Sequence, residues 1–234
     1  MVTTNLPNGV TNAQVDTTLG SYIAPDPTKA HVFFDDFDTF VASGGPWTVT
    51  VVDDGTDGGE VTAVDDADGG VLTLTTNDAD DDANYVQFVN ETFLFEKGKR
   101  LWFKTRFQVD DAEQSDVAIG LYVTDTSPIA SAPTDGVYFL KPDGDQAISL
   151  KVGKDSTYTT VPAAEMEDDT WITLGFVYDG VDKIDIFVND QRVASAPTTN
   201  LPDDEELTVS FAIQAGEAAA KTMLLDYVFV AKER

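Results

Sequence analysis

The chain has 234 residues, one histidine and no cysteine, and its 42 acidic and 14 basic side chains give a formal net charge of -28. Such a charge repels phosphate backbones and anionic lipid, so we expect no direct nucleic-acid binding and no membrane partner. The absence of cysteine excludes disulfides, zinc–thiolate sites and thiol chemistry.

Residues 1–30 are expected to form an extended arm ahead of the folded body. The segment contains three prolines and shows neither a two-residue nor a 3.6-residue apolar period. It has few charges, whereas residues 30–96 hold many acids and no Lys or Arg. The arm is therefore either a passive terminus or a strap that lies along a partner. In the second case its isolated apolar side chains would be the binding residues: Leu6, Val10, Leu19, Tyr22 and Ile23.

Residues 31–234 predict one antiparallel β-sandwich. In LWFKTRFQV, residues 101–109, apolar side chains alternate with a second set that contains Trp102, Lys104 and Arg106. The segments DVAIGLYVT (116–124) and LTVSFAIQA (207–215) alternate in the same way. Strands with one buried and one wet face are typical of antiparallel sheets. Turn-forming segments rich in Asp, Gly and Pro separate them, and no segment has a helical period.

Two aspartate-rich turns are candidates for a calcium site. Carboxylates at alternate positions supply the oxygen ligands that calcium prefers. Neither turn contains the full calcium-loop pattern, and such turns are also expected of any chain this acidic. The two turns are therefore either a calcium site or ordinary turns of an acidic chain, and no cofactor other than calcium is expected. The candidate ligands are Asp66 and Asp68 in the first turn, and Asp78, Asp80 and Asp82 in the second.

The stretch WITLGFVYDGVDKIDIFVNDQRV, residues 171–193, predicts two strands joined at Asp179-Gly180, a tight turn at Asn189-Asp190 and a short returning strand. Together with FFDDF (33–37) and LDYVFV (225–230), it resembles the concanavalin-A-like, or laminin-G-like, jelly roll. That family often has Gly where this chain has Asp190, and Asp tolerates the positive φ of such a turn. The resemblance implies an all-β, antiparallel two-sheet jelly-roll sandwich, with this stretch as scaffold.

The resemblance also raises the question of glycan hydrolysis, because glucanases of this fold carry paired acids in an E-x-D-x-x-E pattern on one strand. No such pattern occurs here. The nearest acids, Glu165, Glu167 and Asp169, are expected on a solvated surface without a partner carboxylate. His31 is expected to pack or hydrogen-bond. We therefore expect no catalytic residue and no enzymatic activity, and keep a hydrolase with unrecognised acids as a third hypothesis.

Trp102 is the candidate for stacking against a sugar, because its strand face otherwise carries Lys104, Arg106 and Gln108. The alternative is that Trp102 covers an edge of the sandwich or lies under a loop. The resemblance includes lectins, which often hold a calcium ion, so the second hypothesis for function is a carbohydrate-binding, lectin-like domain, with a virion surface or fibre as one location for it.

The segments LPNGVTN (6–12) and LGSYIAPDPTKAHVFFDDFD (19–38) resemble N-termini of head structural proteins of tailed phages, particularly marine podophages. This resemblance implies a non-enzymatic capsid decoration, or cement, protein, made in the host cytoplasm and located on the outer capsid surface. Its partner would be the major capsid protein, with other copies of this chain as a further partner. An acidic body would face away from the packaged DNA, and salt would screen its charge.

Overall fold

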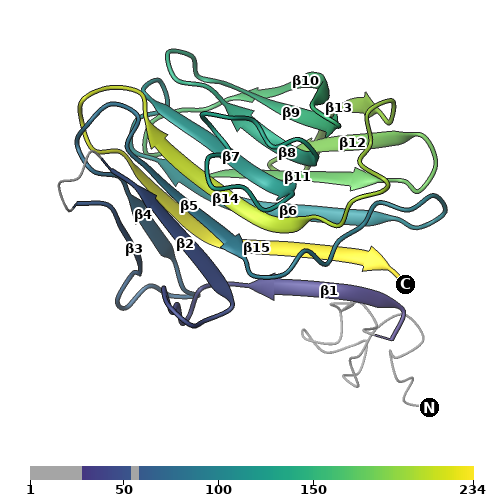
Figure 1. Cartoon of the computed structure of the whole chain (residues 1–234), viewed down its shortest axis with the longest axis horizontal. Helices are drawn as coiled ribbons and strands as arrows, with labels where there is room; N and C mark the ends of the chain where they lie inside the picture. The colour runs from purple at the N-terminus through teal and green to yellow at the C-terminus, as the bar shows by residue number, and fades with distance from the viewer. Residues whose placement is uncertain (1–27, 54–57) are drawn as a thin grey trace.

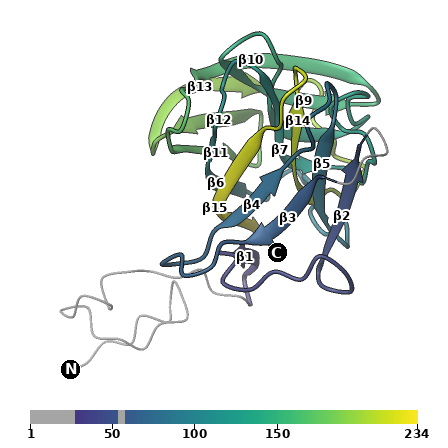
Figure 2. The same ribbon diagram turned by 90° about the vertical axis from the view of Figure 1, so that its left-hand side faces the viewer.

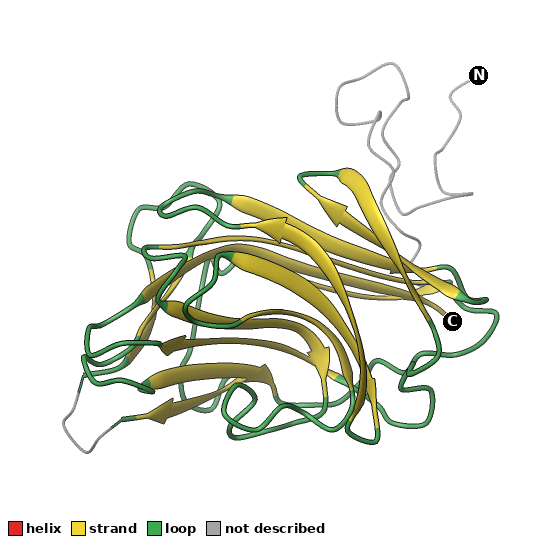
Figure 3. Ribbon diagram, turned by 90° about the horizontal axis from the view of Figure 1, so that it is seen from above, coloured by secondary structure: helices red, strands yellow, loops and turns green. Residues whose placement is uncertain are grey.

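The computed structural model describes residues 28–53 and 58–234 (Figure 1). This part of the chain forms fifteen β-strands and contains no helix (Figure 3). No segment among the described residues is a helix long and apolar enough to cross a membrane. The two-residue alternation of the sequence thus produces an all-β protein, as predicted.

Eight strands form one sheet, called sheet A, and seven form the other, called sheet B. The strands of sheet A are β1 (Ala30–Asp35), β3 (Glu60–Ala63), β4 (Leu72–Thr75), β6 (Leu101–Val109), β11 (Ile172–Tyr178), β12 (Lys183–Val188), β13 (Gln191–Pro197) and β15 (Thr222–Glu233). Those of sheet B are β2 (Trp47–Val52), β5 (Ala83–Phe88), β7 (Ser115–Tyr122), β8 (Gly136–Lys141), β9 (Ala147–Lys154), β10 (Thr157–Glu165) and β14 (Thr208–Ala215).

The two sheets are stacked as layers of a sandwich, and Figure 2 shows them side by side. Sheet A has the order β13-β12-β11-β6-β15-β4-β3, and sheet B the order β10-β9-β8-β7-β14-β5-β2. Every strand pair is antiparallel. The long strand β15 pairs with β4 along its first half and with β1 along its second half. β1 is therefore an edge strand, and it begins at Ala30.

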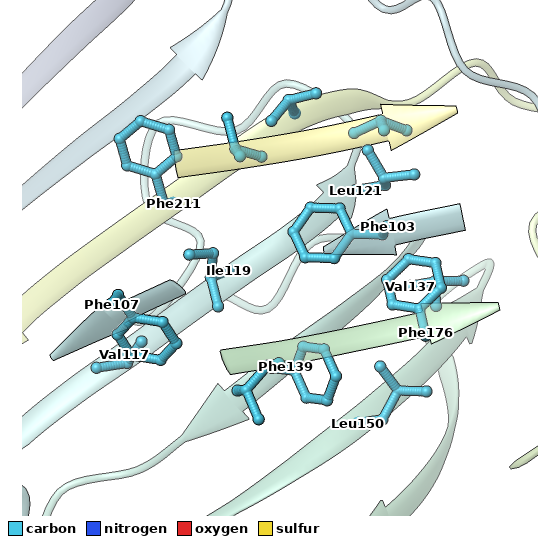
Figure 4. Close-up of a cluster of buried hydrophobic side chains, with 14 of the residues drawn as sticks. Phe103, Phe107, Val117, Ile119, Leu121, Val137, Phe139, Leu150, Phe176 and Phe211 are labelled. Carbon is cyan, nitrogen blue, oxygen red and sulfur yellow. The ribbon is translucent and has the colours of Figure 1, made fainter. Parts of the chain in front are cut away.

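The core lies between the sheets and consists of the inward halves of the alternating strands. Phe103 and Phe107 of β6 meet Phe211 of β14 and Phe139 of β8 in one continuous apolar cluster (Figure 4). The rings of Phe103 and Phe176 stack with centroids 5.1 Å apart. The apolar side chains that the sequence placed in the core from segments 101–109 and 207–215 are fully or almost fully buried: Leu101, Phe103, Phe107, Val109, Leu207, Val209, Phe211 and Ile213.

The 171–193 stretch is scaffold, as predicted. Its two main strands, β11 and β12, are interior strands of sheet A, between β13 and β6. Asn189 and Asp190 connect β12 to β13 with φ angles of 48° and 64°, and the flanking residues Val188 and Gln191 pair directly. Two consecutive positive φ values define the tight hairpin turn that matches the twist of the strands. Asp190 therefore has the positive φ that was predicted for it, at a turn position where the jelly-roll family often has Gly.

Trp47 and His31 both have structural roles. Trp47 starts β2, is 2% exposed, and donates a hydrogen bond from Nε1 to Asp35 Oδ2 at 2.8 Å. The His31 ring stacks on Phe93 with centroids 4.5 Å apart. Burial is the main cause that lowers the pKa of His31, and the positive charges of the nearby Arg234 and Lys232 lower it further. The stacking of His31 on Phe93 agrees with the packing role expected of this histidine from the sequence.

Candidate functional site

The outer face of sheet B is built from tyrosines that lie over glycines. Tyr122 pairs across the sheet with Gly136, and Tyr138 pairs with Gly120. A Cβ atom at Gly120 would lie 2.5 Å from the Tyr138 Cα, so the absence of a side chain at Gly120 leaves the space that Tyr138 needs. The rings of Tyr122 and Tyr138 meet edge-on with centroids 5.3 Å apart. We call this surface, with Tyr85 beside it, the tyrosine face.

The tyrosine face is covered by the loop of residues 123–135, which connects β7 to β8. Ile129 of this loop packs against the tyrosines. On one side, the Asp125 backbone N–H donates to Gln87 Oε1 at 3.1 Å. On the other side, the Tyr158 hydroxyl donates to the Pro133 carbonyl at 2.8 Å. The loop is thus attached at both ends of its span, and Tyr85, Tyr122 and Tyr138 are no more than 2% exposed.

Burial makes the tyrosine face a low-dielectric environment. It raises the pKa of Tyr85 to about 12 and also raises the pKa values of Tyr122 and Tyr138. The hydroxyl oxygens of Tyr122 and Tyr138 have no hydrogen-bond partner among the described residues. Other polar groups of this face are occupied internally, since Gln87 Nε2 donates to Ser210 Oγ at 2.9 Å. The face therefore offers no accessible groups to a ligand.

The outer face of sheet A is open by comparison. One row of side chains crosses it from β1 to β13, one residue from each strand in hydrogen-bonded register. The row, here called the aromatic row, consists of Phe34, Phe229, Lys104, Gly175, Phe187 and Arg192. Phe34 is 56% exposed, which is unusual for a phenylalanine on a strand.

A hollow of about 160 Å³ interrupts the aromatic row at Gly175. Gly175 has no side chain, so the space between Lys104 and Phe187 remains empty. Trp102, Val177 and Phe229 are among the residues that line it. The hollow has the size of a cavity that holds one benzene ring, and it is mostly apolar with a polar rim at Lys104 and Asp190.

The charges on the outer face of sheet A are paired with one another. Lys104 Nζ lies 2.6 Å from Asp190 Oδ1, and Arg106 Nη1 lies 2.5 Å from Asp226 Oδ2. Asp185 accepts from Lys183 and Arg192. Burial opposes ionisation of Asp185, but its bonds to Ser195, Lys183 and Arg192 hold its pKa below the usual range. These ion pairs join four basic side chains to three carboxylates, so the part of the face that contains them is nearly neutral, unlike the chain as a whole.

The predicted site residues are distributed as follows. The arm residues Leu6, Val10, Leu19, Tyr22 and Ile23 lie outside the described residues. Trp102 is half-buried, on the face predicted for it, at the wall of the hollow. It does not cover an edge of the sandwich, because β6 lies between β11 and β15.

The calcium candidates occupy two separate turns. Asp66 and Asp68 belong to the exposed β3–β4 connection, and Asp78 and Asp80 to the exposed β4–β5 connection. Asp82 is buried and accepts a hydrogen bond from the Ala79 backbone N–H at 2.9 Å, so it closes its own turn. Within the described ranges, no group of three or more His, Asp or Glu side chains could hold a metal ion.

Glu165, Glu167 and Asp169 are exposed, as expected. Glu165 nevertheless differs from the prediction in one respect. It lines a shallow polar hollow of about 270 Å³ together with Glu113 and Asp145, so other carboxylates do lie near it. The sequence did not predict this grouping because Glu113 precedes β7, Asp145 precedes β9 and Glu165 ends β10.

Sequence reasoning missed the tyrosine face and the hollow. A signal for the former was present, since Tyr122, Tyr138 and Tyr158 each occur within a strand that also faces a glycine on its neighbour. Recognising this signal requires the register between strands. The hollow had a weaker signal, a glycine inside the alternating strand WITLGFVY, and glycine in a strand often marks a close approach or a bulge.

No family model matches the sequence, and no curated protein is detectably similar to it. Solved structures do share its architecture. The carbohydrate recognition domain of Emp47p aligns with a TM-score of 0.60 at 12% identity, covering 88% of this chain and 98% of that one. An endo-1,3-beta-glucanase from Streptomyces sioyaensis aligns with a TM-score of 0.59 at 13% identity, covering 91% and 99%.

A carbohydrate esterase from the Shiga toxin-encoding bacteriophage phi24B aligns with a TM-score of 0.53 at 14% identity, covering 87% of this chain and 97% of that one. At such identities these likenesses establish the fold and not the activity. The chain is an antiparallel two-sheet jelly roll of the concanavalin-A-like type. The fold occurs in lectins, in enzymes and in a phage-encoded protein, so function has to be argued from the surfaces of this chain.

Proposed function

We propose that the chain is a non-enzymatic capsid decoration protein that binds the major capsid protein on the outer shell and stabilises it. The observation that carries the non-enzymatic part is the closed tyrosine face. A polysaccharide crossing the middle of sheet B would need an open surface, and here the 123–135 loop lies over that surface, with Ile129 packed on the tyrosines.

The assignment to a capsid is supported by three further features. The N-terminal segments resemble head proteins of tailed phages. A net charge of -28 disfavours contact with packaged DNA and favours a position outside the shell. The hollow and the paired charges on sheet A provide a nearly neutral surface that an acidic protein partner would not repel.

The arm of residues 1–30 is the proposed attachment to the shell. Its isolated apolar residues suit shallow pockets between capsid subunits, and its prolines limit the conformational entropy lost on docking. Because the proposed anchors are apolar, attachment should resist moderate salt better than an attachment held by charge.

The test is to mix the purified full chain with undecorated capsids of the virus that encodes it, in about 0.5 M salt. Full-length protein should sediment with the capsids at a fixed ratio, and protein lacking residues 2–29 should remain in the supernatant. A truncated protein that folds and still loads fully would show that the arm is passive. A full-length protein that never sediments with capsids would refute the decoration function.

Carbohydrate binding is the second candidate, because Trp102 lies at the wall of an open hollow with hydrogen-bonding groups on its rim. The hollow that Trp102 lines is also lined by Lys104, Thr173 and Asp190, and sugars bind proteins by stacking on an aromatic ring while polar groups hold their hydroxyls. A glycan array probed with the full chain tests it. Binding that disappears in Trp102→Ala, and persists in Val89→Ala as a control, would favour this function over decoration.

A further inference from the structure

The aromatic row on the outer face of sheet A contains one protruding side chain, Phe34, and one hollow, at Gly175. They are called the knob and the hole. Phe34, on edge strand β1, projects into solvent with 56% of its surface exposed. The hollow at Gly175 lies three strands away along the row, through Phe229 and Lys104. With strands about 4.8 Å apart, knob and hole are separated by about 14 Å. The hollow has room for one aromatic ring.

We propose that two copies of this chain associate through this face, with Phe34 of each copy inserted into the hollow at Gly175 of the other. The inference does not depend on the proposed function. A two-fold axis parallel to the strands, between β15 and β6, exchanges the two positions. A residue of one copy then faces the residue of the second copy that lies equally far from the axis on its opposite side. Phe34 and the hollow at Gly175 lie equally far from the axis, so the same contact forms twice.

The neighbouring positions are complementary under the same axis. Within the aromatic row, Phe229 would face Lys104 of the second copy, a pairing of a cation with a ring and not of two like charges. In the adjacent row, Val32, Ala231, Trp102 and Val177 follow one another across the strands. Val32 would therefore face Val177, and Ala231 would face Trp102. In the row on the other side, Tyr227 would face Arg106.

Charge explains why this face and not another would be used. Two molecules with a net charge of -28 repel one another over most of their surfaces. On this face four basic groups are paired with carboxylates of the same face, so two copies that meet here repel one another less than their net charge alone implies. Added salt screens the remaining repulsion between the bodies. Association should therefore strengthen with salt, which is the opposite of an interface held by ion pairs.

The experiment measures the mass in solution of the full chain by light scattering and sedimentation, at about 0.05 M and 0.5 M NaCl. The expected result is a monomer–dimer equilibrium of the 25.3 kDa chain that shifts toward dimer at the higher salt. Phe34→Ala removes the knob, and Val177→Phe fills the hole. Each should weaken the dimer by at least about tenfold, the effect of losing one central aromatic anchor. Val89→Ala, an exposed apolar residue outside the face, should have no effect.

Mixing the two variants separates this docking from a general loss of apolar surface. A heterodimer of Phe34→Ala with Val177→Phe retains one intact knob and one intact hole, so it should form more readily than either variant dimer alone. A chain that stays monomeric at about 100 µM in high salt would overturn the proposal. So would a dimer insensitive to both substitutions, or one that forms only after residues 2–27 are removed, which would make the chain's own N-terminal segment the occupant.

Discussion

The outer faces of the two sheets differ in how far their side chains are buried. On sheet B, every position of β7 and β14 is buried, including those that point away from the core. On sheet A, β6 alternates strictly between buried and half-buried. The middle of sheet B stabilises the fold on both of its faces, because the 123–135 loop covers the tyrosines on the outer one. Sheet A uses only its inner face for stability, and its outer face is available for a partner.

Substitutions to alanine should reveal this difference most clearly. Tyr138→Ala removes a fully buried ring from beneath the loop, and should lower the free energy of unfolding by about 3–5 kcal/mol. Phe211→Ala in the shared core should cost a similar amount. Phe187→Ala, on the open face, should cost less than about 1.5 kcal/mol, because solvent can enter the space it leaves. Urea unfolding of the three variants measures the ranking, and equal losses for Tyr138 and Phe187 would contradict it.

Alkaline pH should destabilise the covered face. Burial raises the pKa of Tyr85 to about 12, from the usual value of 10.0 for tyrosine. Between those values the unfolded chain loses a proton that the folded chain keeps, so stability falls as pH rises above about 10. For Tyr85 alone the loss approaches roughly 2–3 kcal/mol by pH 12.

Two measurements check this dependence. Urea unfolding at rising pH gives the stability, and absorbance of ionised tyrosine in the folded protein shows how many rings resist titration. Tyr122 and Tyr138, whose pKa values burial also raises, should resist titration with Tyr85. Simultaneous titration of all tyrosines near pH 10 in a protein that remains folded would mean that the loop does not exclude solvent.

Removing single tyrosine hydroxyls should distinguish the hydroxyls that form hydrogen bonds on the covered face from those that do not. The hydroxyls of Tyr122 and Tyr138 have no partner among the described residues, so Tyr122→Phe and Tyr138→Phe should leave stability unchanged or raise it by up to about 1 kcal/mol. Tyr158→Phe is the matched control. It removes a hydroxyl that donates to Pro133 O at 2.8 Å, and should cost about 1 kcal/mol. A clear loss in the first two variants would indicate a buried water at those hydroxyls.

The ion pairs of the open face should contribute least. Lys104 and Asp190 lie 2.6 Å apart, but their side chains are 39% and 71% exposed. Lys104→Met should therefore change the free energy of unfolding by no more than about 0.5 kcal/mol, and about 0.5 M NaCl should reduce even that difference. Thermal unfolding at two salt concentrations measures it. A larger loss would show that this face is part of the folding core after all.

Much of the fold could be predicted from the sequence because its signals are local. Alternation over eight or nine residues decides which side chains of β6 and β14 face the core. Two residues, Asn189 and Asp190, are enough to specify a hairpin turn. The same alternation placed Trp102 and Lys104 together on an outer face, so the surface that contains the hollow was partly predictable.

The sequence by itself therefore determined a two-sheet antiparallel sandwich, its core and several of its turns. Only the tertiary structure decided which outer face is closed and which is open. Alternation separates the two sides of a strand, but it does not say what lies above the outward side. Tyr138 needs Gly120 as its neighbour, and the hollow needs Gly175 between Lys104 and Phe187. These residues meet through the register of hydrogen bonds between strands, which no local pattern encodes.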